Sequence, residues 1–446
     1  MTGYRAARLP VHRGKAAWNA ILGPQPEPQQ LTGNHSADFV IIGGGFAGLS
    51  AARRLTQLQP SARIAVLEAG RLAEGAAGRN SGFMIDLPHE LTSDDYAGHG
   101  DDRKIIALNR QAICFAREAV AEYRIDRNYF DEVGKVNGAV GDAALAHSQS
   151  YASHLTSLGE QVEMLDAQQM RDLSGCAYYK AGLYTPGTVM LQPAGYIRGL
   201  GAGLAGTGVG IFENSAVTGF EKQSGGWLVR TDKGTVTTGR VIVTVNGHLE
   251  SFGIARGQLM QLFLFAVMTP ELPADILRTL GGQPRWGITP SDPMGTTMRR
   301  IDTGQGGNRI VTRTCASLRP DMVSKQTDLN RAVSVMQRKF DQRFPQLAGM
   351  AMEYAWAGHL CLSLNGVSVA REIEDGVYSG CVQNGLGTAR GTLTGICAAE
   401  LACEEVSDIT RHFTSEERPT RLPPQPFRQI GANALLRWKE WRARNE

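Results

Sequence analysis

The feature that most constrains this chain is a glycine-rich turn between an apolar run and a helical pattern. Residues 39–42 are all apolar, which is typical of a strand buried on both faces. Residues 46–58 then carry small and apolar side chains at helical spacing, and residues 64–67 form a second apolar run after a break at Pro60. Strand, glycine turn, helix and strand within about 30 residues predict a βαβ unit.

The turn itself places glycine where a dinucleotide site needs it. Gly43 permits the tight turn, Gly45 lets the backbone approach a diphosphate, and Gly48 lets the helix pack closely on the sheet. The helix begins at Phe46 and Ala47, so its free N–H groups and its positive dipole end face the phosphates. The alternative is a plain glycine-rich turn, but the surrounding strands favour dinucleotide binding.

The end of the second strand supports the same prediction. Glu68 lies about 20 residues beyond the glycine turn, where a carboxylate accepts hydrogen bonds from ribose hydroxyls. Ala69 and Arg71 follow directly, and we expect them at the same end of the ligand.

Two further glycine-rich loops are candidate contacts. Residues 75–82 combine small residues with the donors of Arg79 and Asn80, although a flexible surface loop is an equal alternative. Residues 384–388 follow a predicted strand and lead into a helix, so their amides can face an acceptor. An ordinary turn is the alternative there. The candidate ligand contacts in these loops are Gly78, Arg79, Asn80, Ser81, Gly385, Leu386, Gly387 and Thr388.

Composition excludes several classes of protein. The 446 residues are enough for two or three domain-sized units, and a net charge of +3 gives no reason to expect nucleic acid as a partner. No apolar run reaches the roughly 18 residues that span a bilayer, and no apolar segment of a secretory signal follows the first residues. The seven cysteines show no CxxC spacing, so we expect no metal site and a reducing, cytoplasmic setting. Oligomeric state is not predicted.

Periodicity predicts an α/β chain with alternating elements. Residues 1–36 are expected to form an irregular arm over the body. Residues 425–446 are expected to form a basic amphipathic helix that docks through Leu435, Leu436 and Trp438, the alternative being a peripheral membrane patch. Helices are predicted over 101–124, 143–174, 192–205, 326–342 and 390–403, and strands over 130–140, 181–191, 209–222, 226–231, 235–245, 257–270, 295–316 and 376–382.

These motifs, together with the turn at 256–258 and the Trp-Ala-Gly element at 356–358, resemble the D-amino-acid oxidase and glycine oxidase superfamily of FAD enzymes. Within that superfamily the chain looks most like gamma-glutamylputrescine oxidoreductases. The resemblance implies FAD as cofactor and implies that Val217, Asn246 and Gly247 lie beside it. It also implies a Rossmann-like FAD domain with a βαβ unit of the glutathione-reductase type, and a substrate domain with a mixed or antiparallel sheet. We expect the FAD domain to combine residues 37–90, 192–255 and 345–446, and the substrate domain 91–191 and 256–344.

The resemblance further implies oxidation of a small-molecule amine or N-substituted amino acid at its C–N bond. Hydride would pass to flavin N5, the resulting imine would hydrolyse, and O2 would be the acceptor. Two alternatives stay open. One is an FAD-dependent dehydrogenase that passes electrons to a quinone or carrier protein. The other is a non-flavin protein, either NAD-dependent or merely nucleotide-binding, although no second GxGxxG motif for a pyridine nucleotide is present.

Substrate anchoring is expected from an arginine, whose planar fork matches a carboxylate. Four candidates lie in residues 295–316, and the resemblance favours the first two: Arg299, Arg300, Arg309 and Arg313. A solvated charge is the alternative for each. His359 follows the Trp-Ala-Gly element, where the family chain passes near the flavin, and the alternative is a structural histidine.

Two departures from the superfamily concern the cofactor and its neighbourhood. Many relatives carry Thr-Pro-Asp after the Trp-x-Gly element, whereas this chain has Ser-Leu-Asn-Gly at 363–366. Related sarcosine oxidases tether FAD through a cysteine in this neighbourhood, and Cys361 is the residue here. Its spacing to Asn365 is shorter than in those enzymes, so we expect non-covalent FAD and a buried thiol.

Overall fold

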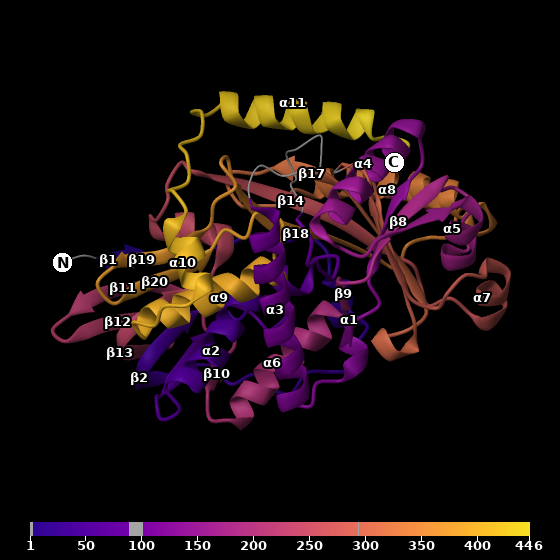
Figure 1. Ribbon diagram of the computed structural model, residues 1–446. Coiled ribbons are helices and arrows are strands. Elements are labelled where there is room, and N and C mark those ends of the chain that lie inside the picture. The colour runs from indigo at the N-terminus through magenta and orange to yellow at the C-terminus, as the bar shows by residue number, and fades with distance from the viewer. Residues whose placement is uncertain (1–2, 89–100, 293) are drawn as a thin grey trace.

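The computed structural model describes residues 3–88, 101–292 and 294–446. These described residues form two large sheets, one of nine strands and one of eight, with helices packed around them (Figure 1). We call them the first and the second sheet. This arrangement confirms the predicted α/β class with a Rossmann-like part and a mixed second sheet.

The first sheet contains the predicted βαβ unit. Its strands β2 and β3 are parallel, and α2 connects them. β13 pairs with β2 and β20 pairs with β13, both in parallel, while the meander of β11, β12 and β13 is antiparallel. The strands are β1 (Gly3–Arg5), β2 (Gly33–Ile42), β3 (Ile64–Leu67), β10 (Gly210–Phe212), β11 (Val217–Gln223), β12 (Gly226–Thr231), β13 (Gly234–Val243), β19 (Val369–Glu374) and β20 (Val377–Cys381).

Two helices that pack against each other both begin beside the first sheet. α2 (Phe46–Leu58) follows β2, and α9 (Ala389–Ala402) follows β20. Gly395 allows their close approach, because a β-carbon there would lie 2.1 Å from the carbonyl oxygen of Ala47. α3 (Asp102–Glu122) and α6 (Pro193–Gly206) pack on the outer side of this pair (Figure 1).

The second sheet runs in the order β18-β14-β17-β16-β15-β6-β8-β7. α8 (Gln326–Arg343) covers β14 and β17, and α4 (Asp142–Leu158) packs on β8. Burial on both faces explains its apolar central strands. The strands are β6 (Lys135–Ala139), β7 (Glu163–Asp166), β8 (Ala181–Thr185), β14 (Leu259–Met268), β15 (Trp286–Pro290), β16 (Thr297–Ile301), β17 (Arg309–Leu318) and β18 (Tyr354–Ser363).

Short elements complete the described fold. β4, β5 and β9 form a small antiparallel sheet, and α1 lies in the N-terminal segment. The helix α10 packs on α9. Their bounds are α1 (Ala17–Ala20), β4 (Phe83–Met84), β5 (Phe130–Asp131), α5 (Ala167–Ser174), β9 (Val189–Leu191), α7 (Ala274–Leu280), α10 (Asp408–Ser415) and α11 (Phe427–Arg442).

The structure differs from the predicted elements in several places, and the predicted strands over 130–140, 181–191 and 209–222 are each divided into two strands. The predicted helix over 143–174 is wrong, because Gly159 at φ +85° ends α4 and β7 precedes α5. The N-terminal arm is not wholly irregular, since β1 pairs with β11. All ten residues of β18 pair with β14 in the second sheet, although the expected division assigns residues 345–446 to the FAD domain.

The face that the C-terminal helix turns toward the body also differs from the prediction. We expected Leu435, Leu436 and Trp438 to pack on the body. Leu436 is partly buried, but about half of Leu435 and of Trp438 is exposed on the outer face of α11. The helix meets the body through polar groups instead, because Asn433 and Glu440 bond to backbone groups of β17. No helix in the described residues is long and apolar enough to cross a membrane.

Candidate active site

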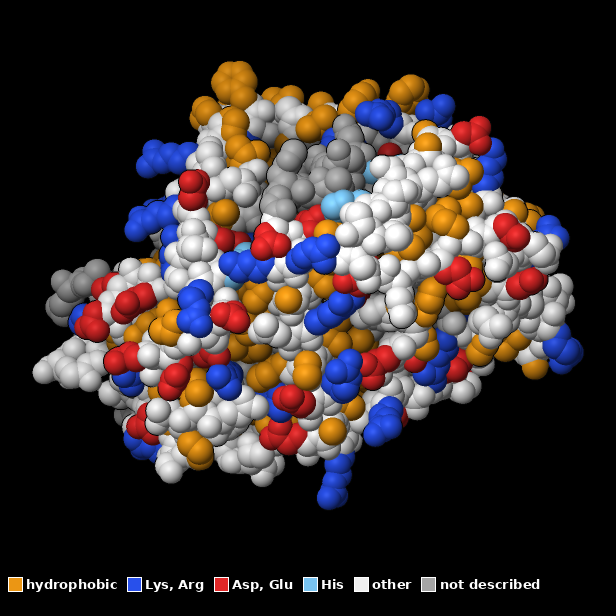
Figure 2. All heavy atoms as spheres, viewed as in Figure 1, with side chains coloured by type: hydrophobic (Ala, Val, Ile, Leu, Met, Phe, Trp, Pro, Cys, Tyr) orange, Lys and Arg blue, Asp and Glu red, His pale blue; other side chains and the backbone are white. Residues whose placement is uncertain are grey.

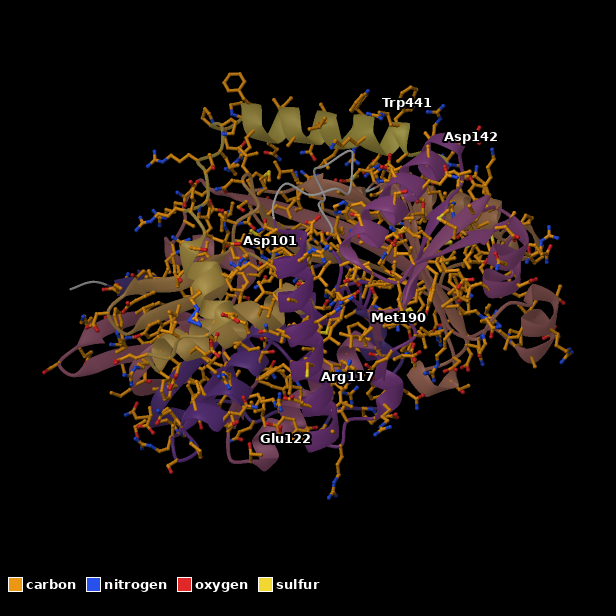
Figure 3. The ribbon with its side chains drawn as sticks, in the orientation of Figure 1. Asp101, Arg117, Glu122, Asp142, Met190 and Trp441 are labelled. Carbon is orange, nitrogen blue, oxygen red and sulfur yellow. The ribbon has the colours of Figure 1, made fainter. Side chains whose placement is uncertain are left out.

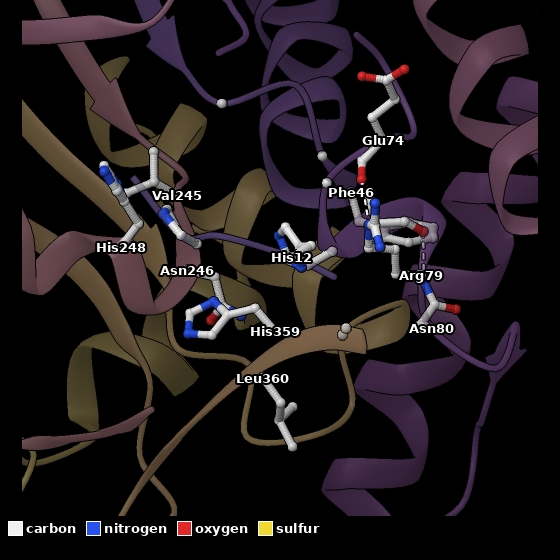
Figure 4. Close-up of a pocket in the computed structure, with 18 of the residues that line it drawn as sticks. His12, Phe46, Glu74, Arg79, Asn80, Val245, Asn246, His248, His359 and Leu360 are labelled. Atoms are coloured by element: carbon white, nitrogen blue, oxygen red, sulfur yellow. Dashed lines mark hydrogen bonds between the residues drawn. The ribbon is translucent and has the colours of Figure 1, made fainter. Parts of the chain in front are cut away.

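A cavity of about 730 Å³ lies between the glycine turn of the first sheet and one face of the second sheet. Residues 264–266 of β14 and residues 356 and 358–360 of β18 line it, and β17 contributes Val311 and Arg313. Its size falls within the range of small-molecule and cofactor pockets, roughly 300–1,000 Å³. Figure 4 shows part of its lining, including His12, Arg79 and His359.

The N-terminus of α2 opens into this cavity without a protein cap. Gly43 makes the turn at φ +107°, and no side chain caps the helix. A β-carbon at Gly45 would have only Ala77 as a neighbour, at 3.6 Å, so the backbone here is open to the cavity. The first amides of α2 are therefore available to a ligand acceptor.

The N-terminus of α9 opens into the same cavity. Gly385 adopts φ +86°, and both Gly385 and Gly387 line the space. No side chain caps this helix, because the Thr388 hydroxyl donates to the carbonyl oxygen of Phe83 instead. Two uncapped helix N-termini in one cavity form two places where an anionic group is stabilised.

Glu68 holds the glycine turn against the end of β3. Its carboxylate accepts hydrogen bonds from the amide of Gly44 at 2.8 Å and from the amide of Gly70 at 3.1 Å. Burial raises the pKa of Glu68, and the backbone amides partly offset that rise. The carboxyl group lines the cavity beside Ala69 and Arg71.

The loop at 75–82 is fixed by its own polar groups. Arg79 donates to the carbonyl oxygens of Glu74, Gly14 and Ala357, which ties the loop to the N-terminal segment and to β18. Burial lowers the pKa of Arg79 to about 10. Asn80 donates to Ala77 and thereby closes a short turn. The loop is therefore an ordered wall of the cavity rather than a flexible surface loop.

Neutral polar groups line the wall between the two sheets. Asn246 sits at φ +50°, and its buried side-chain oxygen has no hydrogen-bond partner in the described structure. The same holds for Nδ1 of His12. His359 contacts Oε1 of Gln261 through Nε2 at 2.9 Å, and its ring lies 6.4 Å from that of His12 (Figure 4). Burial lowers the pKa of both histidines to about 3, so both rings are neutral near pH 7.

Most of the predicted ligand contacts meet in this cavity. The predicted residues that line it are Gly43, Gly45, Phe46, Ala47, Glu68, Ala69, Arg71, Arg79, Asn80, Ser81, Val217, Asn246, Gly385, Gly387 and His359. The predicted residues outside the lining are Gly48, Gly78, Gly247, Leu386, Thr388, Arg299 and Arg300.

Three glycines in the second group serve packing. A β-carbon at Gly48 would lie 1.8 Å from the carbonyl oxygen of Gly43, and one at Gly78 would lie 1.8 Å from that of Ala73. A β-carbon at Gly247 would lie 2.3 Å from Oε1 of Gln261. These glycines shape the walls rather than the lining.

The arginines of the second sheet separate into structural and cavity-facing groups. Arg299 is fully buried and donates to the carbonyl oxygens of Ser81 and Leu191 and to Gln305. Arg300 donates to the carbonyl oxygen of Gly281, and Arg309 pairs with Glu353. Neither Arg299 nor Arg300, the two favoured anchors, reaches the cavity.

Arg313 is the exception among the four arginine candidates. It lines the cavity from β17, opposite Ala266 of β14. No hydrogen bond or ion pair of its side chain is found in the part of the chain that the structure describes. Burial lowers the pKa of Arg313, and the nearby Cys315 partly offsets that effect. Among the residues that the structure describes, this guanidinium therefore has no acidic partner.

Cys361 belongs to the protein core. Its side chain is fully buried in a cluster with Val243, Leu259 and Cys381, and it does not line the cavity. Burial raises the pKa of this thiol well above its ordinary value, which disfavours the nucleophilic thiolate.

Comparison with known proteins identifies the family. A model of the family described as FAD dependent oxidoreductase, DAO, matches residues 38–401, which is more than half of the chain. The chain belongs to this family of FAD-dependent oxidoreductases. It is 22% identical to a probable oxidoreductase, OrdL, of Rhizobium meliloti over 90% of this chain and 91% of that protein. It is 25% identical to gamma-glutamylputrescine oxidoreductase of Escherichia coli, over 82% and 83% of the two chains.

A solved structure shows the same fold. Glycine oxidase from Geobacillus kaustophilus superposes with a TM-score of 0.68 at 17% identity, covering 84% of this chain and 96% of that one. The predicted superfamily is therefore confirmed by both sequence and fold.

The residues present fit the cofactor of the FAD-dependent family. Two uncapped helix N-termini, a carboxylate at the end of β3 and an unpaired amide oxygen all face one cavity. A dinucleotide has acidic phosphates and polar ribose and ring edges to match these groups.

Several lining residues were not predicted. They include the N-terminal segment 9–12, residues 244–245, His248, Phe252, residues 264–266, Val311 and Leu360. β14 and β18 are nearly continuous apolar runs, so the sequence does not show which of their residues face the glycine turn. The approach of His12 is a long-range contact without a sequence signal.

Proposed function

We propose that this protein oxidises the C–N bond of an amine or an N-substituted amino acid, using non-covalent FAD. Membership of the FAD-dependent family supports the redox class. Among its relatives, one is named for oxidising gamma-glutamylputrescine and one for oxidising glycine, and both names describe an amine as substrate.

In this proposal the cavity described above holds FAD. Residues 43–47 at the start of α2 bind the diphosphate, and Glu68 binds the adenosine ribose. The start of α9, at Gly385 and Gly387, faces the ring edge where negative charge builds on reduction. The cofactor supplies the acceptor for the hydride that leaves the carbon next to nitrogen.

Arg313 is the observation that carries the substrate part of the proposal. The guanidinium of Arg313 is partly buried in the cavity wall, where a charge is costly without an acidic partner, and none is present in the described structure. A substrate carboxylate would provide that partner through two parallel hydrogen bonds. We therefore propose an amine that also bears a carboxylate, held by Arg313 against the face formed by β14, β17 and β18.

The remaining groups position the substrate and exclude water. His12 and His359 are neutral, so they can accept or donate a hydrogen bond without competing for the carboxylate. Phe252, Leu264 and Trp356 line the cavity with apolar surface, which strengthens the interaction with Arg313. In this proposal the amine enters in its deprotonated form, so the reaction requires no strong general base.

The test is a panel of amines mixed with the protein without oxygen, followed by loss of the flavin absorbance. The panel contains N-methyl amino acids, glutamylated polyamines, D-amino acids and the methyl ester of each. We expect bleaching by carboxylate-bearing amines and much slower bleaching by their esters. Bleaching by 2-hydroxy acids but by no amine would overturn the proposal.

The electron acceptor is tested separately. We propose O2, and the alternative is a quinone or a carrier protein. An oxidase consumes oxygen and releases hydrogen peroxide at the rate of amine oxidation, whereas a dehydrogenase turns over only with an added dye or quinone.

A further inference from the structure

The outer face of α11 exposes a continuous apolar stripe. The exposed side chains are spaced so that they fall on one face of the helix. Figure 2 shows apolar side chains along the upper edge of the molecule, where Figure 1 places α11, and Figure 3 shows Trp441 there. The members of this stripe are Phe427 (73% exposed), Ile430 (66%), Leu435 (52%), Trp438 (49%) and Trp441 (60%).

The opposite face of α11 fixes this orientation. β16 pairs with β17 only as far as Arg313, so later amides of β17 need other acceptors on that edge. Glu440 accepts from the amide of Ala316 at 2.9 Å, and Asn433 accepts from that of Leu318 at 2.9 Å. Turning the helix over would leave these amides unpaired, so the apolar stripe cannot fold back onto the body.

The C-terminal end of the chain is held in the same way. The Glu446 carboxylate accepts from the amide of Gly141 at 3.0 Å, and Lys339 donates to the carbonyl oxygen of Ala443 at 3.1 Å. The segment from Asn433 to Glu446 is therefore held against the body, and α11 presents its stripe outward.

The charges around the stripe are basic. The guanidinium of Arg442 lies 5.0 Å from the ring of Trp438, and that of Arg444 lies 4.6 Å from the ring of Trp441. The acidic residue of α11, Glu440, is turned inward and paired with Arg331 at 2.8 Å. Within the described residues of α11, the outer face offers cations and no free carboxylate.

We propose that α11 is an interfacial helix that binds the surface of an anionic phospholipid bilayer. Tryptophan is the side chain that favours the bilayer interface, with its apolar body inside and its N–H toward water. Arg442 and Arg444 extend from the rim of the stripe toward lipid phosphates while their stems cover apolar surface. A second copy of this chain fits less well, because it brings the same cations and no free carboxylate from this face.

Binding in this mode lays the helix in the plane of the interface, without crossing the bilayer. The stripe lies on α11, outside the lining of the cavity, so changes to it leave amine oxidation in free solution unaltered. The proposal is therefore independent of the proposed function.

Tryptophan fluorescence gives a specific test. The chain has six tryptophans, and Trp18, Trp227, Trp286 and Trp356 are buried. The signal that acrylamide quenches in the holoprotein therefore comes from α11. We expect vesicles of phosphatidylcholine with phosphatidylglycerol to protect this signal, and vesicles of phosphatidylcholine alone to protect it much less. The difference is expected because the negative charge of phosphatidylglycerol attracts the arginines beside the stripe.

Co-sedimentation with the same vesicles provides the second measurement. The variant Trp438→Ser/Trp441→Ser should bind anionic vesicles about tenfold more weakly or worse, since two large apolar side chains no longer enter the interface. The matched control is Leu364→Ser/Val406→Ser, which removes two exposed apolar residues elsewhere and should bind like the wild type. Arg442→Gln/Arg444→Gln should remove the preference for anionic vesicles.

Three results would overturn the proposal. The first is that the wild type sediments with neither kind of vesicle. The second is that the double tryptophan variant binds as tightly as the wild type. The third is the absence of vesicle binding together with a dimer, seen by light scattering, that dissociates in the double tryptophan variant. That result would assign the stripe to a second copy of the chain.

Discussion

The α-carbon of Gly48 faces the carbonyl oxygen of Gly43 so closely that a β-carbon on Gly48 would lie 1.8 Å from it. This contact joins the first turn of α2 to the end of β2. It shows that one glycine of the motif serves helix packing. Gly45 serves access to the cavity instead, because a β-carbon there would have no neighbour nearer than 3.6 Å.

The two glycines give a matched pair of variants. Gly48→Ala should cost the protein about 3 kcal/mol or more in stability, because neither the backbone of Gly43 nor Thr244 can move away cheaply. Gly45→Ala should fold with nearly unchanged stability but bind FAD at least about tenfold more weakly, since its methyl group enters the diphosphate space. Denaturant unfolding of the apoprotein and flavin titration separate the two effects. Equal loss of stability in both variants would contradict the assignment.

The sequence predicted the parts of the site that depend on local geometry. Residues 43–48, Glu68 and the start of α9 each combine a strand end with a helix start, and those contacts are set within a few residues. The fold class followed from the same alternation of strands and helices.

The long-range contacts of the site could not be predicted from the sequence. The pairing of β16 with β17 puts Arg299 opposite Val311 and Arg313 opposite Thr297, on the same face of the second sheet. What separates the two arginines is the part of the molecule that packs against each position along that face, and the sequence does not indicate this. The position of β18 depends on its register with β14, and that of His12 on the path of the N-terminal arm. The periodicity of α11 revealed a stripe but not which side of the helix meets the body.

Arg313 should determine affinity for the carboxylate of the substrate. Arg313→Ala should raise KM for a carboxylate-bearing amine by about ten- to a hundredfold, since a charged hydrogen-bonded pair contributes about 1.5–3 kcal/mol. Arg313→Lys should restore part of the affinity, and the ester of the same amine should be affected little. The measurement is steady-state kinetics with each substrate.

Arg299→Met is the comparison for that experiment. Because Arg299 is buried among carbonyl oxygens, its loss should lower thermal stability and leave the ratio of acid to ester KM unchanged. If Arg299→Met changes this ratio while Arg313→Ala does not, the anchor has been assigned to the wrong arginine.

Flavin should separate from the protein without a covalent bond. Cys361 lies in the core with a raised thiol pKa and outside the cavity lining, so it lacks both access and nucleophilicity. Acid precipitation should release all flavin into the supernatant, and Cys361→Ala should retain the flavin content of the wild type. Flavin that remains in the pellet with the wild type and not with Cys361→Ala would show a thioether at this position.

Acid should destabilise the apoprotein through its buried histidines. Burial lowers the pKa of His12 and His359 to about 3 and that of His248 to about 4, below the ordinary 6.5. Between these values the unfolded chain binds more protons than the folded one, so the free energy of unfolding falls as pH falls below 6.5.

For one such histidine the loss at pH 5.5 is about 1–2 kcal/mol. Denaturant unfolding at pH 7.5 and pH 5.5 measures the difference, and His359→Gln should reduce it by that amount. The control is Phe263→Leu, which removes apolar contacts 5.3 Å from the His359 ring without removing a titrating group. It should lower stability equally at the two pH values, because the loss of packing does not depend on protonation. A pH difference unchanged in His359→Gln would mean that this histidine has the same pKa in the folded and the unfolded chain.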